Sequence, residues 1–284
     1  MIWIAFAGKE LLRKKVVLVA IALTLVYLTL FCYGLTRMAQ EGNGDAGMAQ
    51  MGGLIGGMIL MSLGLLFAGM IVTFLVLFAT MGTISGEVEN GLMLAVLARP
   101  IPRWKLYLGK YLGTGFWLVV YSTVLFFAIL LPVHFIAHMP LYSGAMLKAW
   151  LLFIWMPLLL LALTMLGSVY LPMLGNGVAC AMLYGMSMFT GFAETLFNAS
   201  GGNEALSSSS LILSLVMPIN AVFSRLTYEI INGPDLPLLP DMANAMGPFS
   251  PTNVPSPAFI VYTVVYLVVL LALGCRAFKR KEIA

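Results

Sequence analysis

The stretch TISGEVENGLMLAVLARPIPRWKLYLGKYLG, residues 83–113, separates two long apolar runs of the chain. It holds six ionic side chains and two prolines, although only 9% of the whole chain is charged. A simple connection between two helices needs only two to about eight residues. The length and polarity of this stretch therefore indicate a structured segment with a binding role.

The composition identifies the surroundings of that segment. Of the 284 residues, 61% are hydrophobic, and the mean hydropathy is +1.01. A soluble domain carries about a quarter charged residues, so this much apolar surface requires lipid as its solvent. The chain is predicted to be an all-α integral membrane protein. The net charge of +4 does not indicate nucleic acid, because the basic residues cluster beside apolar runs.

About 20 apolar residues are needed for a helix to cross the hydrocarbon layer. A seventh apolar segment, Leu211–Met217, is too short for this and ends at Pro218, so we expect it to form a re-entrant or interfacial helix. Six segments are long enough, and they are predicted to be transmembrane helices: 16–35, 54–81, 111–133, 149–171, 178–197 and 258–276.

The basic residues orient these six spans. With both termini inside, 12 of the 15 lysines and arginines lie on the cytoplasmic side. Positive charge accumulates on that side of membrane proteins, which predicts an N-in, C-in topology with residues 83–110 in the cytoplasm. Only Arg37, Lys148 and Arg225 remain outside.

The segment 198–257 precedes the last span and is rich in proline. Such proline density predicts an irregular cap or a mobile outer loop rather than another span. No internal repeat or separate soluble domain is evident, so residues 1–284 are expected to form one membrane domain.

The opening stretch has its own helix signals. Ser85 is suited to cap a short helix whose first turns contain Glu87 and Glu89, where the helix dipole favours carboxylates. Leu92–Leu97 then supplies a short apolar face, and Arg99-Pro100 ends it because the residue before proline avoids helical geometry. The stretch is predicted to be a rigid protrusion.

This stretch resembles the cytoplasmic segment of ABC-2 type (type-2, type V) ABC-transporter permeases. The resemblance extends to the N-terminal KELLRKK, the six spans, the long outer segment and the basic tail CRAFKRKEIA. It implies a coupling helix that contacts a separate ATPase subunit through Glu87, Glu89, Asn90 and Gly91. Arg99, Pro100, Arg103 and Lys110 would shape the exit into the third span. The alternative is that these residues only anchor the loop at lipid headgroups.

The chain has no phosphate-binding loop, since Gly8-Lys9 is followed by Glu10 and Gly109-Lys110 by Tyr111. The resemblance therefore implies that ATP and Mg bind to a partner ATPase present in two copies, and that this chain binds no cofactor and is not itself an enzyme. It also implies a second permease chain, identical or different, a role in export, and a prokaryotic inner membrane.

Two other functions are alternatives to transport. The long segment 198–257 suits a membrane sensor or assembly factor. An intramembrane enzyme would need convergent catalytic groups, and only His134, His138 and Glu194 are available. The histidine pair lacks further ligands for a metal, and Glu194 is close enough to a helix end to reach the surface. The three cysteines, Cys32, Cys180 and Cys275, have no metal-binding or disulfide spacing.

Two further patterns concern packing. Ile4, Ala7 and Leu11 share one face of the basic N-terminal segment, which predicts an interfacial elbow helix before the first span; the alternative is a basic start that only sets the topology. Small residues four apart let helices approach closely, and they occur here as Gly52 with Gly56, Gly53 with Gly57, and Gly109 with Gly113.

Overall fold

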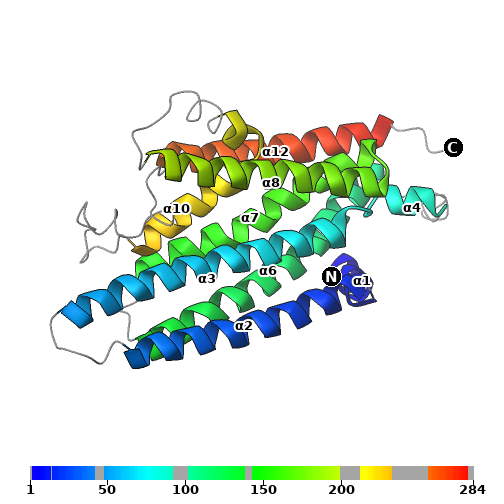
Figure 1. Ribbon diagram of the computed structural model, residues 1–284. Helices are drawn as coiled ribbons and strands as arrows, with labels where there is room; N and C mark the ends of the chain where they lie inside the picture. Colours follow the sequence, from blue (N-terminus) through cyan, green and yellow to red (C-terminus); the bar gives the residue numbers. More distant parts are fainter. Residues whose placement is uncertain are drawn as a thin grey trace.

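The computed structural model describes residues 2–13, 15–41, 48–91, 102–137, 143–198, 212–231 and 255–280, and every regular element among them is an α-helix. Six long helices run the length of one bundle (Figure 1). They are α2 (Lys15–Glu41), α3 (Met48–Thr80), α6 (Arg103–Ala137), α7 (Ser143–Tyr170), α8 (Met173–Asn198) and α12 (Pro257–Arg280).

The six predicted spans correspond one to one to these helices. Most of the helices extend one or two turns beyond the predicted limits, because a helix does not end where its apolar part ends. α8 lies beside the others and contains the polar Asn176, but it is not among the stretches apolar enough to cross a membrane. Five stretches within the described residues are long and apolar enough to cross a membrane: Lys15–Met38, Gly56–Glu89, Arg103–Ile136, Ser143–Tyr170 and Pro257–Arg280.

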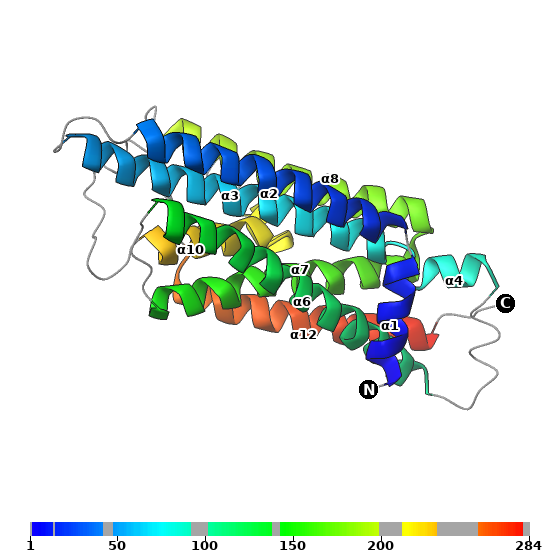
Figure 2. The same cartoon turned by 90° about the horizontal axis from the view of Figure 1, so that it is seen from below.

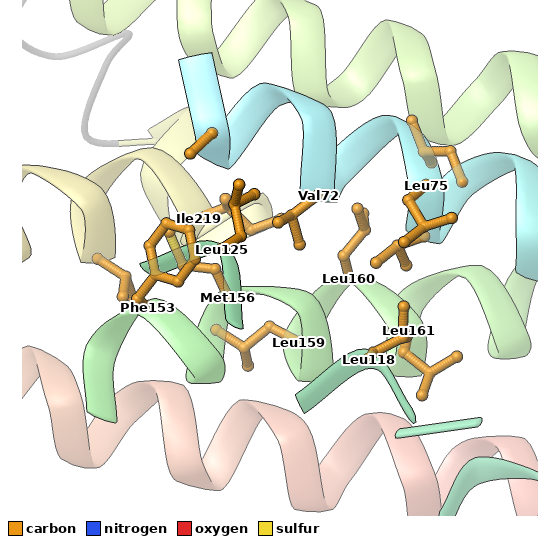
Figure 3. Packing of buried hydrophobic residues seen from close by; sticks show 14 of the residues in the cluster. Val72, Leu75, Leu118, Leu125, Phe153, Met156, Leu159, Leu160, Leu161 and Ile219 are labelled. Carbon is orange, nitrogen blue, oxygen red and sulfur yellow. The ribbon is translucent and has the colours of Figure 1, made fainter. Parts of the chain in front are cut away.

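The core of the bundle lies around α6 and α7. α7 contacts α3, α6, α8, α10 and α12, whereas α2 and α12 lie at the periphery. Buried side chains of α3, α6, α7 and α10 converge between these helices (Figure 3); for example, the rings of Phe126 and Phe153 have centroids 5.5 Å apart. The peripheral helices instead expose apolar side chains such as Leu18 and Val261, as expected for helices solvated by lipid.

The chain reverses direction in the half of the bundle opposite α4. Residues 212–216 are helical, the chain turns at Pro218, and α10 (Ile219–Ile231) leads toward the end opposite α4 (Figure 1). A short helix is thus present within the predicted segment 211–217, and its re-entrant or interfacial placement stays a prediction. α10, within the segment predicted to be irregular, was missed. Hydroxyl groups satisfy the carbonyl oxygens freed at the turn: Tyr262 donates to Leu215 (2.6 Å), Tyr266 to Val216 (2.6 Å) and Ser187 to Met217 (3.2 Å).

The N-terminal helix α1 (Ile2–Arg13) lies across one end of the bundle, at a steep angle to α2 (Figure 2). Ala7 and Leu11 are buried, and Trp117 of α6 donates its indole N–H to the Ile4 carbonyl at 2.9 Å. The face predicted from the sequence is therefore the face that packs. The start of α1, the end of α12 and the short helix α4 (Ser85–Glu89) lie at this same end.

Candidate functional site

Charge divides the two ends of the bundle. We call the end that carries α1, α4 and the last turns of α12 the basic end. Arg37, Lys148 and Arg225 belong to the opposite half, on α2, α7 and α10. The separation predicted from the sequence is therefore present in space. Described basic residues of the basic end are Lys9, Lys15, Arg103, Lys105, Lys110, Arg276, Lys279 and Arg280.

α4 projects from the basic end (Figure 1). It follows a turn at 81–84 and ends at Asn90, after which Gly91 adopts a φ of +69°, a conformation that glycine adopts without steric cost. Ile84, not Ser85, occupies the N-cap position, and no side chain caps the helix. The predicted capping role of Ser85 is wrong, because its hydroxyl donates to the Met81 carbonyl at 3.3 Å.

Ser168 of α7 attaches the start of α4 to the bundle. Its hydroxyl oxygen accepts hydrogen bonds from the amides of Ile84 (3.1 Å) and Ser85 (2.9 Å). All three residues are buried. A satisfied bond of this kind stabilises by about 1 kcal/mol, whereas a buried amide without a partner costs about 1–3 kcal/mol. The first turn of α4 is therefore fixed to α7.

Lys110 of α6 also holds the first turn of α4 and the turn before it. Its ammonium group donates to the Thr83 carbonyl at 2.9 Å and forms an ion pair with Glu87. The Lys110 side chain is only 9% exposed and that of Glu87 20% exposed. The resemblance assigned Glu87 to a contact with another subunit and Lys110 to the exit into the third span, but in the structure the two side chains pair with each other.

Glu89 also has a partner within the chain. Its carboxylate accepts the backbone N–H of Met173, the first residue of α8, at 2.9 Å. A carboxylate at this position satisfies an unpaired amide and is favoured by the helix dipole. Glu89, Asn90 and Gly91 are nevertheless exposed, so the tip of α4 is a polar surface that this chain does not cover.

A family model described as ABC-2 family transporter protein matches residues 7–283 of this chain. The chain belongs to the ABC-2 transporter family. The match covers α1 through α12, so the resemblance seen in the α4 region extends over the whole molecule. ABC-2 proteins are membrane components of transporters, and this chain is accordingly an integral membrane protein. A comparison with curated proteins finds no match.

This ABC-2 protein has a buried polar cluster at the base of α4, between the end of α3, α7 and α8. Asn176 of α8 is fully buried, and its amide donates to the carbonyls of Met81 and Thr164, both at 2.9 Å. The hydroxyls of Thr80 and Thr164 lie 2.9 Å apart. Sequence reasoning missed this cluster, although an asparagine within an apolar segment is a signal that merits a search for its partners.

The remaining predicted residues of the ABC-2 chain are dispersed. Arg99 and Pro100 lie outside the described residues. Arg103 begins α6 and donates to the Lys279 carbonyl at 3.4 Å, which connects α6 to the end of α12. His134 is exposed, whereas His138 and the side chain of Glu194 lie outside the described part. In that part, no three metal-ligating side chains come together, and the three cysteines are free.

The predicted glycines differ in their surroundings. Gly109 and Gly113 are buried in α6, and Gly57 is buried in α3. A Cβ added at Gly56 would lie 3.1 Å from the Met38 methyl group, so this glycine faces α2. Gly52 and Gly53 belong to α3, but their packing lies outside the described part. Gly64 has tighter surroundings, with Phe31 Cε2 only 2.6 Å from an added Cβ.

Proposed function

We propose that this chain is the membrane-spanning subunit of an ATP-driven exporter, coupled to a separate ATPase subunit through residues 83–110. The observation that carries the proposal is the attachment of α4. The helix projects from the basic end and its tip is exposed. Hydrogen bonds and an ion pair fix its base and the turn before it to α6, α7 and α8. A force applied to the tip would therefore move the bundle rather than bend a loop.

The basic end is proposed to face the cytoplasm, in agreement with the positive-inside rule. In this arrangement α8 is the fifth of six spans. α7 ends at the basic end, α12 starts at the opposite end, and α8 runs between them. Burial of Asn176 against α3 and α7 explains how a less apolar helix is accommodated.

ATP and Mg are proposed to bind to the partner ATPase, present in two copies, and a second permease chain is proposed to complete the transport path. Closure of the ATPase pair would push the α4 helices and shift the spans between two arrangements. Export as the direction follows from the family resemblance alone, and a prokaryotic inner membrane is proposed on the same ground.

Because Glu87 is paired with Lys110, the proposed contact moves to Glu89, Asn90 and Gly91. A photoactivatable benzoylphenylalanine at Asn90 tests it in membranes that contain the chain and a co-expressed ABC ATPase subunit. We expect a crosslink to the ATPase from position 90 and none from the same group at Thr36, at the opposite end. Absence of the crosslink at position 90, with the ATPase present in the membranes, would refute the coupling role.

A further inference from the structure

We propose that Ser168 and Asn176 form a buried latch that carries displacement of α4 to α7 and α8. They are positioning residues, and the inference rests on the function proposed above. α4 is joined by the chain to α3 through the turn 81–84, and the chain continues from it to α6. No such connection joins it to α7 or α8, so noncovalent contacts must transmit any movement to those helices.

Ser168 forms the first half of the latch. One hydroxyl oxygen receives two successive amides of the α4 start, Ile84 at 3.1 Å and Ser85 at 2.9 Å, and lies 3.2 Å from the Ser85 hydroxyl. Ser168 is fully buried, so water does not compete for these donors. Movement of the α4 base must either carry α7 with it or leave two buried amides without an acceptor.

Asn176 forms the second half. Its amide group bridges the Met81 carbonyl, at the turn before α4, and the Thr164 carbonyl in α7, while its side-chain oxygen accepts the Cys180 thiol at 3.6 Å. A single side chain of α8 is thereby bonded to both elements that meet at the base of α4. Because Asn176 is fully buried, replacement of these partners by water is also excluded.

α7 and α8 pack closely against each other and against the turn before α4. A Cβ added at Gly167 would overlap the Asn176 side-chain oxygen, and one added at Gly177 would lie 2.8 Å from the Met81 sulfur. A Cβ added at Gly82 would lie 2.7 Å from the Met173 sulfur. Packed interfaces of this kind respond by discrete shifts rather than by continuous deformation. The latch is therefore suited to transmit a small displacement.

Two fluorescent probes separate movement on the two sides of the latch. In a chain with Cys32→Ala, Cys275→Ala and Cys180→Ser, the last of which keeps the donor to Asn176, bimane is attached at Phe78→Cys on α3 or at Leu174→Cys on α8. Both side chains are exposed. The complex with the ATPase is reconstituted, and emission is compared without nucleotide and after trapping with ATP and vanadate.

In the unsubstituted latch we expect both probes to respond to trapping. With Ser168→Ala and Asn176→Leu combined, the response at position 174 should fall to the part that the Glu89–Met173 contact transmits, while the response at position 78 and recovery of the ATPase should persist. Ser168→Ala alone should reduce the response at 174 and serves if the double variant does not fold. Ser122→Ala is the matched control, because Ser122 is a fully buried serine whose hydroxyl has no hydrogen-bond partner among the described residues.

A full response at position 174 in the variant with altered Ser168 and Asn176 would overturn the latch. A loss of both responses with the ATPase still bound would also overturn it, because a transmission element should spare α3. If the unsubstituted chain fails to bind the ATPase, the proposed function itself is refuted, and that outcome is recognised before any latch variant is compared.

Discussion

The ammonium group of Lys110 and the carboxylate of Glu87 form an ion pair that joins α6 to α4. The same ammonium group donates to the Thr83 carbonyl, so one lysine holds both the turn and the helix that follows it. A buried charge that loses its partner is costly, which makes this pair a structural support of the projection.

A double-mutant cycle tests this support. Lys110→Met leaves the Glu87 carboxylate unpaired, and Glu87→Gln leaves the ammonium group without a charge partner. We expect each single change to lower the free energy of unfolding by about 2 kcal/mol and the double change to cost less than the sum of the two. Thermal unfolding in detergent, followed by tryptophan fluorescence, measures the effect. Strictly additive losses would show that the two groups do not stabilise each other.

The pair also changes how charge at the coupling segment should be tested. Reversal of both Glu87 and Glu89 would break two contacts within the chain, so weaker binding of the ATPase would not report on docking alone. Glu89→Gln is the sharper change, since its amide oxygen still accepts the Met173 amide while the charge disappears. We expect ATPase affinity to fall by up to roughly fivefold, or about 1 kcal/mol, as measured by titration in detergent.

Lys105→Gln is the control for that titration. Lys105 is exposed at the start of α6 and is expected to contact headgroups, where one charge contributes about 1 kcal/mol to membrane attraction. Its removal should leave ATPase affinity unchanged. If the Glu89→Gln variant and the unsubstituted chain bind the ATPase with equal affinity, the charge of Glu89 does not contribute to docking.

The topology gives a further prediction. In the chain without native cysteines, Asn90→Cys should react with a membrane-impermeant maleimide only from the cytoplasmic side, and Thr36→Cys only from outside. The reason is the separation of basic residues along the bundle. Segments 36–53, 138–148 and 198–257 share the predicted outer location. Labelling of position 90 from outside in sealed cells would show that the chain has the opposite orientation.

The long helices were predictable because each contains about 20 apolar residues, and that length requirement is a property of the bilayer rather than of the fold. α10 was not predicted, because it contains the charged residues Arg225 and Glu229 and because the segments next to it in the sequence are rich in proline. The two charges sit one turn apart and form an ion pair, which a reading of composition counts as polar loop. The buried residues Ile219, Val222, Leu226 and Ile231 nevertheless follow helical spacing, so a helical signal was present in the sequence and was overlooked among the prolines.

The sequence predicted where the projecting segment lies in the chain, but not which residues its side chains contact. Residues 83–91 form the expected projection, because glycine and charged residues between two apolar runs leave few alternatives. The partners of Glu87 and Glu89 depend on where α6 and α8 begin in space, and no local pattern contains that information. For the same reason, sequence reasoning could name Lys110 as part of the segment but could not pair it with Glu87.

Gly64 and Gly34 make a matched pair for the packing of α2 against α3. An added methyl group at Gly64 would meet Phe31 Cε2 at 2.6 Å and Ile129 Cγ2 at 3.2 Å, whereas nothing lies within 4 Å of one at Gly34. Gly64→Ala should therefore destabilise the protein by about 1–3 kcal/mol. Gly34→Ala should be neutral or stabilise by up to about 1 kcal/mol, because alanine favours helix. Apparent melting temperatures that change equally would mean that α2 and α3 do not pack closely there.

The last prediction concerns the half of the bundle opposite the basic end, where Glu229 of α10 lies between two cations. It forms an ion pair with Arg225 one turn earlier and with Lys148 of α7 at 3.4 Å, and Arg225 also donates to the Pro255 carbonyl at 3.3 Å, just before α12. Because Arg225 and Glu229 are largely buried while Lys148 is 66% exposed, the bond within α10 should dominate.

Glu229→Gln keeps an acceptor for the guanidinium group but removes the charge, and we expect a loss of about 1–2 kcal/mol. Hydrogen exchange should then accelerate in 219–231 and at the start of α12, since Arg225 connects the two. Lys148→Gln is the control and should cost less than about 1 kcal/mol, as for other exposed ion pairs. If Lys148→Gln proves the more destabilising change, α10 is held to α7 by its outer salt bridge, and the buried Arg225–Glu229 pair contributes little to its position.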